Sequence, residues 1–131
     1  MENKEKEERN KEIALMIGAV EGKDLWGMSA LKLEQFKRNC YSNQLQDWFL
    51  NPYFTLSELE FDWDWNWLME AIKFVSKLEV SLIWFKESNL SLSKNEIIQI
   101  LKEKFIEADS FETFKFVSDI AKSYNEGSFD R

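Results

Sequence analysis

Residues 58–79 change periodicity partway along, and this change constrains the fold more than any other stretch. Up to residue 65 acidic and apolar side chains alternate, which is typical of an extended segment with one buried face. The acidic face comprises Glu58, Glu60, Asp62 and Asp64, and the apolar face comprises Leu59, Phe61, Trp63 and Trp65. We therefore expect an extended arm that leads directly into the following segment.

From Trp67 onward the apolar residues recur every three or four positions, which predicts one face of an amphipathic helix. These positions are Leu68, Ala71, Ile72, Val75 and Leu78. Asp64 or Asn66 is expected to cap the helix, because a short polar side chain there accepts a hydrogen bond from a free amide of the first turn.

The N-terminal residues mix Glu with Lys and Arg at a spacing of four, which supports a solvated helix once apolar residues anchor it. We expect that helix over residues 3–17, anchored by Ile13 to Ile17, with residues 1–10 frayed or solvated. Gly18 is expected to end it in a left-handed conformation. The alternative is a disordered charged tail.

Residues 18–57 have no dominant periodicity. Their glycines fit a turn region or a short hairpin, and residues 31–40 fit either a strand or a short helix, of which we favour the helix. Residues 42–46 are polar and predict a loop, and Pro52 is expected to break the structure that precedes it.

Alternation over Val80 to Phe85 predicts a strand with apolar residues on both faces, and hence an interior position. Leu90 and Leu92 are expected to return beside it as a short antiparallel strand. Ser93 and Glu96 then form a capping box, which predicts that a helix begins there.

Two helices complete the chain. The first is expected to run to Ala108 and the second, which begins with Asp109 as its cap, to about Tyr124, where Asn125 and Gly127 end it. The buried stripe of the first is predicted to be Ile97, Leu101, Phe105 and Ala108, and that of the second Phe114, Val117, Ala121 and Tyr124. The fold class is therefore α+β: one domain over residues 1–131, with helices packed around a short antiparallel sheet and a helix-rich C-terminal half.

Composition excludes several kinds of chemistry. The chain has no histidine, which is the commonest general base and zinc ligand, and its single cysteine, Cys40, has no histidine partner. A net charge of −7 disfavours direct contact with nucleic acid. With one cysteine and no apolar run long enough to cross a bilayer, we expect a cytoplasmic protein that neither forms an internal disulfide nor enters a membrane.

Candidate site residues lie in the alternating segment. Asp62, Asp64 and Asn66 imitate the start of a calcium-binding loop, but Trp67 stands where that loop requires glycine and Lys73 where it requires a bidentate carboxylate. The row Glu58, Glu60, Asp62 and Asp64 remains a candidate for binding or, as a weaker alternative, for metal-dependent hydrolysis. A solvated acidic face is the simpler interpretation.

Three tryptophans lie in the same segment. Trp63 and Trp67 are four residues apart and share a helical face, whereas Trp65 lies on a different side, over Met69. At least one ring is therefore expected near the surface, where it can stack on a base or anchor a partner. The alternative is that all three belong to the core.

Residues 65–69, Trp-Asn-Trp-Leu-Met, and the helix that follows to Leu78 resemble a Trp-Asp-Trp-Leu-Met helix signature found in small bacteriophage and prophage proteins, which are similar to the phage ABA sandwich family. Residues 10–18 and 111–125 resemble the short first helix and the aromatic-rich last helix of those proteins. This chain departs from them by Asn66 in place of Asp, by a longer middle and by an additional helix from Lys94. The resemblance implies helices around a small antiparallel sheet and a phage or mobile-element origin, and it implies no catalytic residue.

Together these observations favour a non-enzymatic phage accessory protein that needs no cofactor and binds a host protein, for instance to inhibit a defence system. Its expected binding residues are Trp63, Trp65, Trp67, Glu58, Glu60, Asp62 and Asp64. The alternatives are a sponge for a nucleotide signal, in which Lys37 and Arg38 meet phosphate, and the metal-dependent hydrolase. We also expect a homodimer, formed through apolar side chains that lie outside the buried stripes of the helices, namely Met69, Phe74, Phe116 and Ile120. The alternative is that each helix is covered on two sides within one domain.

Overall fold

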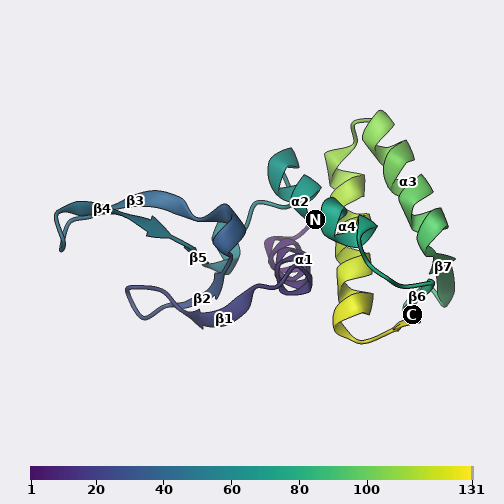
Figure 1. Ribbon diagram of the computed structural model, residues 1–131, viewed down its shortest axis with the longest axis horizontal. Coiled ribbons are helices and arrows are strands. Elements are labelled where there is room, and N and C mark those ends of the chain that lie inside the picture. Colours follow the sequence, from purple (N-terminus) through teal and green to yellow (C-terminus); the bar gives the residue numbers. More distant parts are fainter. Residues whose placement is uncertain (131) are drawn as a thin grey trace.

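The first half of the chain folds mainly into short antiparallel hairpins and the second half mainly into helices. In the computed structural model, which describes residues 1–130, the hairpins form an arm that projects from a helical body (Figure 1). The predicted α+β class is confirmed. The elements are α1 (Asn3–Met16), β1 (Val20–Lys23), β2 (Ser29–Lys32), the 3-10 turn η1 (Glu34–Phe36), β3 (Arg38–Ser42), β4 (Asp47–Asn51), β5 (Tyr53–Phe54), the 3-10 turn η2 (Leu56–Glu58), α2 (Trp65–Ser76), β6 (Leu82–Phe85), β7 (Leu90–Ser93), α3 (Lys94–Ile106), α4 (Ser110–Asn125) and β8 (Phe129–Asp130).

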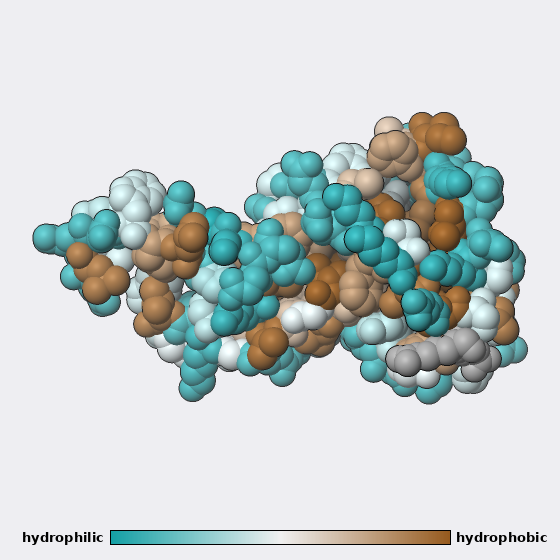
Figure 2. All heavy atoms as spheres, in the orientation of Figure 1, coloured by the Kyte–Doolittle hydropathy of each residue, from teal (hydrophilic) through white to brown (hydrophobic). Residues whose placement is uncertain are grey.

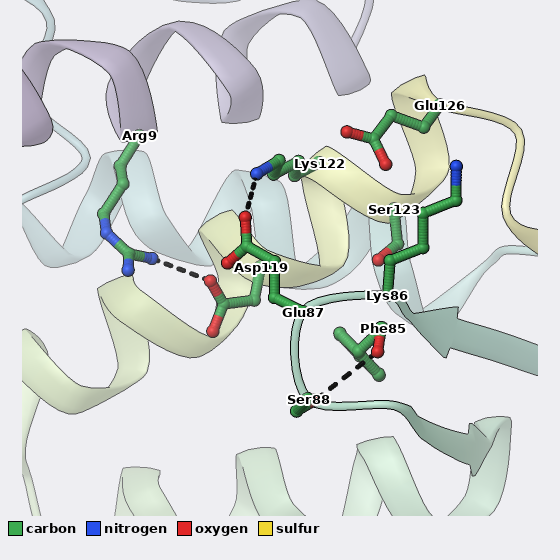
Figure 3. Close-up of a pocket in the computed structure, with 9 residues that line it drawn as sticks. All are labelled: Arg9, Phe85, Lys86, Glu87, Ser88, Asp119, Lys122, Ser123 and Glu126. Carbon is green, nitrogen blue, oxygen red and sulfur yellow. Dashed lines mark hydrogen bonds and ion pairs between the residues drawn. The ribbon is translucent and has the colours of Figure 1, made fainter.

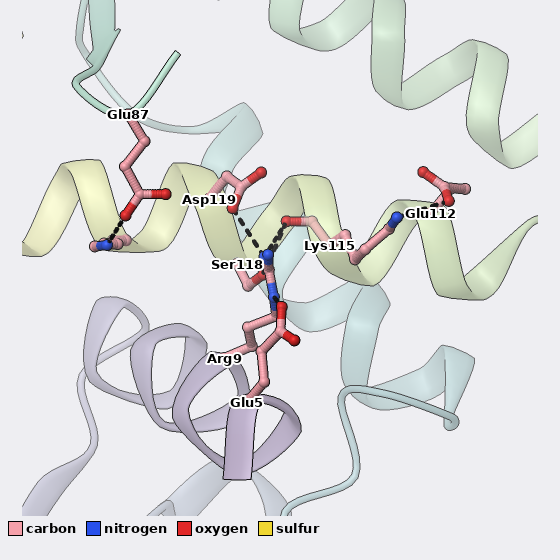
Figure 4. Close-up of polar contacts among 8 residues, drawn as sticks. Glu5, Arg9, Glu87, Glu112, Lys115, Ser118 and Asp119 are labelled. Carbon is pink, nitrogen blue, oxygen red and sulfur yellow. Dashed lines mark hydrogen bonds and ion pairs between the residues drawn. The ribbon is translucent and has the colours of Figure 1, made fainter. Parts of the chain in front are cut away.

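The charged N-terminal segment is helical, as predicted, and α1 packs along α4, so that Asn10, expected in a frayed or solvated stretch, is instead buried. Gly18 has a φ of +103°, which a residue with a side chain rarely adopts, so glycine ends the helix as expected. Ile13 and Ala14 are fully buried. Arg9 adds a polar link, because its guanidinium donates hydrogen bonds to Ser118 and Asp119 of α4 (Figure 4).

Residues 20–54 form the arm, and the helix that the sequence favoured for residues 31–40 is wrong. Leu31 lies in β2, where it pairs with Glu21 of β1 on one side and with Phe54 of β5 on the other. β3 and β4 form a separate two-stranded hairpin, in register from Arg38 opposite Asn51 to Ser42 opposite Asp47. Pairing partners that are distant in sequence decided the conformation here, which local periodicity does not report.

The segment before α2 is not the extended arm that its alternation predicted. The carbonyl of Glu60 accepts hydrogen bonds from the amides of Trp63 and Asp64, so the chain turns there. Leu59 and Phe61 are buried as expected, but the turn carries Trp63 to the surface. The side chain of Asp64 caps α2 by accepting from the Asn66 amide, and the helix begins at Trp65, two residues earlier than the apolar pattern indicated.

The C-terminal sheet has β6 at its centre between β7 and β8, and the predicted antiparallel return of β7 is confirmed. Ile83 and Phe85 face the core, where α4 packs against the sheet. Leu82 and Trp84 are 40% and 44% exposed, so the expectation that both faces of this strand are covered is wrong. Helices therefore cover only one face of this sheet.

The predicted caps of α3 and α4 are confirmed. Ser93 and Glu96 form the reciprocal capping box, and Asp109 accepts a hydrogen bond from the amide of Glu112. The predicted stripe of α3 fails at Phe105, which is 56% exposed, and at Ala108, which is exposed because the helix ends at Ile106 and not at Ala108 as predicted. In contrast, Ile120 of α4 is fully buried, because α1, α2, α3 and β6 all pack against this helix.

The side chains proposed for a dimer face are therefore mostly committed to contacts within the domain. Phe116 stacks on Phe85 with ring centroids 6.3 Å apart, and Phe74 meets Tyr124 edge to face at 5.7 Å. Together with buried Ile120, these contacts fit the alternative in which the helices are covered on two sides.

Candidate functional site

Trp67 lies where the arm joins the helical body, in the centre of an aromatic cluster. Its indole stacks on Phe36 with centroids 4.0 Å apart and an interplanar angle of 4°. Phe54 of β5 and Phe61 meet the same indole edge to face at 5.0 and 5.2 Å. With only 7% of its surface exposed, Trp67 fastens the arm to α2 and is not available to a ligand.

The other two predicted tryptophans have different environments. Trp65 is partly buried and meets Phe105 of α3 edge to face at 5.8 Å. Trp63 is 61% exposed, because the turn after Glu60 directs it away from the core. Of the three rings singled out in the sequence, Trp63 is therefore the one that is displayed.

The predicted row of carboxylates is dispersed by the same turn. Asp64 caps α2, and Asp62 turns toward α1, where it accepts a hydrogen bond from Asn10 at 3.0 Å. Within the part of the chain that the structure describes, no three acidic or cysteine side chains are grouped so as to hold a metal ion. The geometry therefore does not support a site in which the four carboxylates bind one ligand or metal ion together.

Glu58 lies in η2 at the base of the arm, where hydrogen bonds fix its side chain. It accepts hydrogen bonds from the amide and hydroxyl of Thr55, both at 2.9 Å, and pairs with Arg38 of β3 at 2.5 Å. Partial burial by itself would raise the pKa of Glu58, but the Thr55 and Arg38 hydrogen bonds outweigh it, so this pKa lies below its ordinary value. Glu60 shows the opposite shift, because partial burial and then the charge of Asp64 raise its pKa.

The most prominent feature of the surface is a set of exposed apolar side chains on the arm, which we call the arm patch. Figure 2 shows apolar residues along the projecting arm. Each member is at least 49% exposed: Val20, Leu25, Trp26, Met28, Tyr41, Leu45, Trp48 and Leu50. Sequence reasoning missed this set, since its residues lie in the stretch that had no dominant periodicity.

Local structure fixes the two ends of the arm patch. Between β1 and β2, the Asp24 carboxylate accepts hydrogen bonds from the amides of Trp26 and Met28, both at 2.9 Å, and Gly27 adopts a φ of +76°. On the other hairpin, Tyr41 and Trp48 are direct cross-strand partners whose rings meet at 5.5 Å. The apolar groups are thus presented by hydrogen-bonded turns and strands.

The arm also differs from the body in charge. The arm together with the η2 turn at its base, residues 19–58, contains four basic and five acidic side chains, which leaves most of the net charge of −7 on the body. A nearly neutral, aromatic surface on an acidic molecule is the composition typical of the centre of a protein–protein interface, where charged residues are depleted.

Two hollows lie elsewhere on the body. A groove of about 380 Å³ between α2 and α3 is lined mainly by apolar side chains, among them Met69, Ile72 and Phe105. A polar pocket of about 300 Å³ lies beside α4 (Figure 3), where Arg9 pairs with Asp119 and Lys122 with Glu87. The charged groups of that pocket neutralise one another, so it shows no preference for an anion or a cation.

The fold and its surface define a small α+β domain with a projecting hairpin arm. No protein-family model matches the chain, and neither the curated proteins nor the solved structures contain a significant match to it. Among the described residues, no helix is both long and apolar enough to span a membrane.

Proposed function

We propose that the protein is a non-enzymatic binding protein whose arm patch attaches to another protein. In keeping with the resemblance to bacteriophage and prophage proteins, the partner is a protein of the host cell, met in the host cytoplasm, and the chain is an accessory factor such as an inhibitor of a defence system. The observation that carries the proposal is the gathering of exposed apolar side chains on the projecting arm.

The chemistry of the arm patch supports this role. Tryptophan, tyrosine and methionine are enriched in interface centres, and a few such residues supply most of the binding free energy. Trp26, Met28, Tyr41 and Trp48 are all at least 49% exposed. Burying them against a partner removes apolar surface from water, at roughly 25 cal/mol for each Å².

The alternatives have less support. A nucleotide sponge would hold phosphate with Lys37 and Arg38, but Arg38 is already paired with Glu58, and the net charge of −7 disfavours a phosphate ligand. A hydrolase that uses the acidic row would need its carboxylates to converge, whereas Asp62 and Asp64 face different elements.

Site-specific photocrosslinking tests the proposal. A photoactivatable phenylalanine analogue replaces Trp48 on the arm in one variant, and Ile106 on α3, which is 82% exposed, in a matched control. In cells of a candidate bacterial host, we expect the variant with the analogue at position 48 to form one discrete crosslink to a host protein. The control variant, with the analogue at position 106, should not form it. The same crosslink must disappear when Trp26→Ser is added to the Trp48 variant, since this change removes apolar surface from the other hairpin of the arm patch.

Identical crosslinks from the arm and from α3, or crosslinks from α3 alone, would contradict the proposal. Circular dichroism and thermal melting of each variant show whether it remains folded. The substituted side chains are exposed, so we expect the melting temperatures to match that of the wild type.

A further inference from the structure

A small pocket of about 270 Å³ lies between α1 and the chain that leads into α2. Its wall includes Lys6, Glu7 and Asn10 of α1, and Asp62 and Trp63 from the turn before α2. Two of the residues singled out in the sequence, Asp62 and Trp63, are thus brought together here with polar side chains from a distant segment. The pocket is separate from the arm patch.

Asn10 is a buried polar side chain with an unused acceptor. It is 2% exposed, and its Nδ2 donates to Oδ1 of Asp62 at 3.0 Å. This hydrogen bond fixes the orientation of the amide, because the reverse orientation would bring two acceptors together. Within the described chain Oδ1 of Asn10 has no hydrogen-bond partner. This oxygen has almost no accessible surface, so Asn10 does not touch a ligand directly but holds Asp62 in place at the wall of the pocket.

Asp62 adds a negative charge with spare accepting capacity. Its side chain is only 13% exposed, and its Oδ2 lies 3.8 Å from Nζ of Lys6, which is too far for a hydrogen bond. Lys6 is the more exposed partner at 39%, so it can turn to solvent and leave the carboxylate to an incoming cation. Glu7 in the same wall and the net charge of −7 also disfavour an anionic ligand.

Trp63 supplies an aromatic surface beside these acceptors. It is 61% exposed, so a cation can approach its indole ring. A guanidinium group suits both the indole and the carboxylate, because it is planar, stacks on an indole and pairs with carboxylates in a forked geometry. An ammonium group is a compact, strongly hydrated charge that neither stacks nor forks.

We propose that this pocket binds a guanidinium group, which stacks on Trp63 and donates hydrogen bonds to Asp62, oriented by Asn10, in place of Lys6. The site does not depend on the arm patch, so either proposal stands if the other fails. The guanidinium is that of an arginine side chain in a protein or that of free arginine, and the experiment separates these two sources.

Nitrogen–proton NMR spectra of the full chain provide the test, with N-acetyl-arginine methylamide as the probe. We expect saturable shifts of two signals, the indole N–H of Trp63 and the side-chain amide of Asn10. N-acetyl-lysine methylamide, at the same charge, is expected to bind at least about threefold more weakly, since it lacks the stacking interaction. Free L-arginine is the third probe.

If free L-arginine binds more weakly than the blocked probe, the site is assigned to an arginine side chain of a protein. The reason is that the carboxylate of the free amino acid would be repelled by Asp62 and Glu7. Equal or tighter binding of the free amino acid assigns the site to the metabolite. No shift of either signal with both arginine probes overturns the proposal, and so does equal affinity for the lysine probe.

Two variants give the proposal a further test. Lys6→Met removes the competing cation and is expected to tighten binding of the blocked arginine probe. Trp63→Ala is expected to weaken it about threefold or more through loss of the cation–π contact, whereas Trp48→Ala on the arm leaves it unchanged. Weaker binding by folded Lys6→Met, or unchanged binding by folded Trp63→Ala, would overturn the assignment.

Discussion

Trp63 and Trp67 are four residues apart and have opposite roles, because one turn of the backbone separates their environments. Trp67 is 7% exposed and contacts three phenylalanine rings, whereas Trp63 is 61% exposed. The first is a structural residue at the base of the arm, and the second is available for binding.

Trp67→Ala is expected to lower the free energy of unfolding by about 3–5 kcal/mol, because it removes a large ring from a closely packed cluster. Trp63→Ala is the matched control and is expected to change it by less than about 0.5 kcal/mol. Urea denaturation followed by circular dichroism measures both. Equal losses for the two variants would show that Trp67 does not join the arm to the body in the way described.

Glu58 makes the stability of the arm depend on pH. Its pKa is lowered in the folded protein, because hydrogen bonds from Thr55 and Arg38 outweigh its partial burial, so folding favours the ionised form. The resulting stabilisation is present above the pKa of the unfolded chain, about 4.3, and is lost as the pH falls through the lower pKa of the folded state.

Glu58→Gln is therefore expected to be less stable than the wild type at pH 7, and the difference should shrink as the pH falls below about 4. Because both Arg38 and Glu58 are about 40% exposed, at 38% and 40%, we expect a difference of at most about 1 kcal/mol. Urea denaturation at several pH values measures it, with Glu70→Gln on the exposed side of α2 as the control. A difference that is constant from pH 3 to pH 7 would argue against this role of Glu58.

At the scale of the elements, the helices of the C-terminal half are set by local signals. Ser93→Ala removes the hydroxyl that accepts from the amide of Glu96, and we expect it to lower the free energy of unfolding by about 1 kcal/mol. Asn95→Ala, at an exposed position in the first turn of the same helix, should change it by less than about 0.5 kcal/mol. Thermal melting compares the two variants, and a smaller effect at Ser93 than at Asn95 would contradict the cap.

These local signals explain why the helices could be predicted from the sequence. The caps at Ser93 and Asp109 and the glycine stop at Gly18 depend only on neighbours within a few residues. The strands of the arm depend instead on pairing with one another, as in the hairpins β1–β2 and β3–β4 and between Leu31 and the more distant Phe54. Periodicity over a few residues does not contain that information.

The candidate sites were predictable only in part, for the same reason. Asp62 and Trp63 could be singled out because acidic and aromatic residues alternate there, but their partner Asn10 comes from α1 and no local pattern points to it. The arm patch could not be identified from the sequence, since Trp26 and Trp48 are large apolar residues of the kind that usually form a core. Trp48 is exposed because its hairpin, β3–β4, pairs with no third strand among the described residues, and Trp26 is exposed because it lies in the turn between β1 and β2.

At the scale of the whole molecule, charge and exposed apolar surface are unevenly distributed. The body carries most of the net charge of −7, whereas the shorter arm is nearly neutral and displays the eight apolar side chains of the arm patch. Repulsion between acidic bodies keeps copies of the chain apart at low ionic strength. At 0.1 M salt, charges more than about 10 Å apart are largely screened from one another. Contacts between arms therefore become more favourable as salt is added.

Association of the protein with itself is therefore expected to use the arm and not α4. In the absence of another partner, the light-scattering mass of the wild type should rise above 15.7 kDa as concentration increases, and more so in 0.5 M than in 0.05 M salt. A folded variant with Trp26→Glu and Trp48→Glu should keep the monomer mass at both concentrations, because the charges face solvent on the exposed arm. Ile120→Glu should instead fail to fold, since it places an unpaired charge in the core around α4. A strictly monomeric wild type in high salt, or a well-folded Ile120→Glu that alone abolishes association, would rule against the arm as the surface through which copies meet.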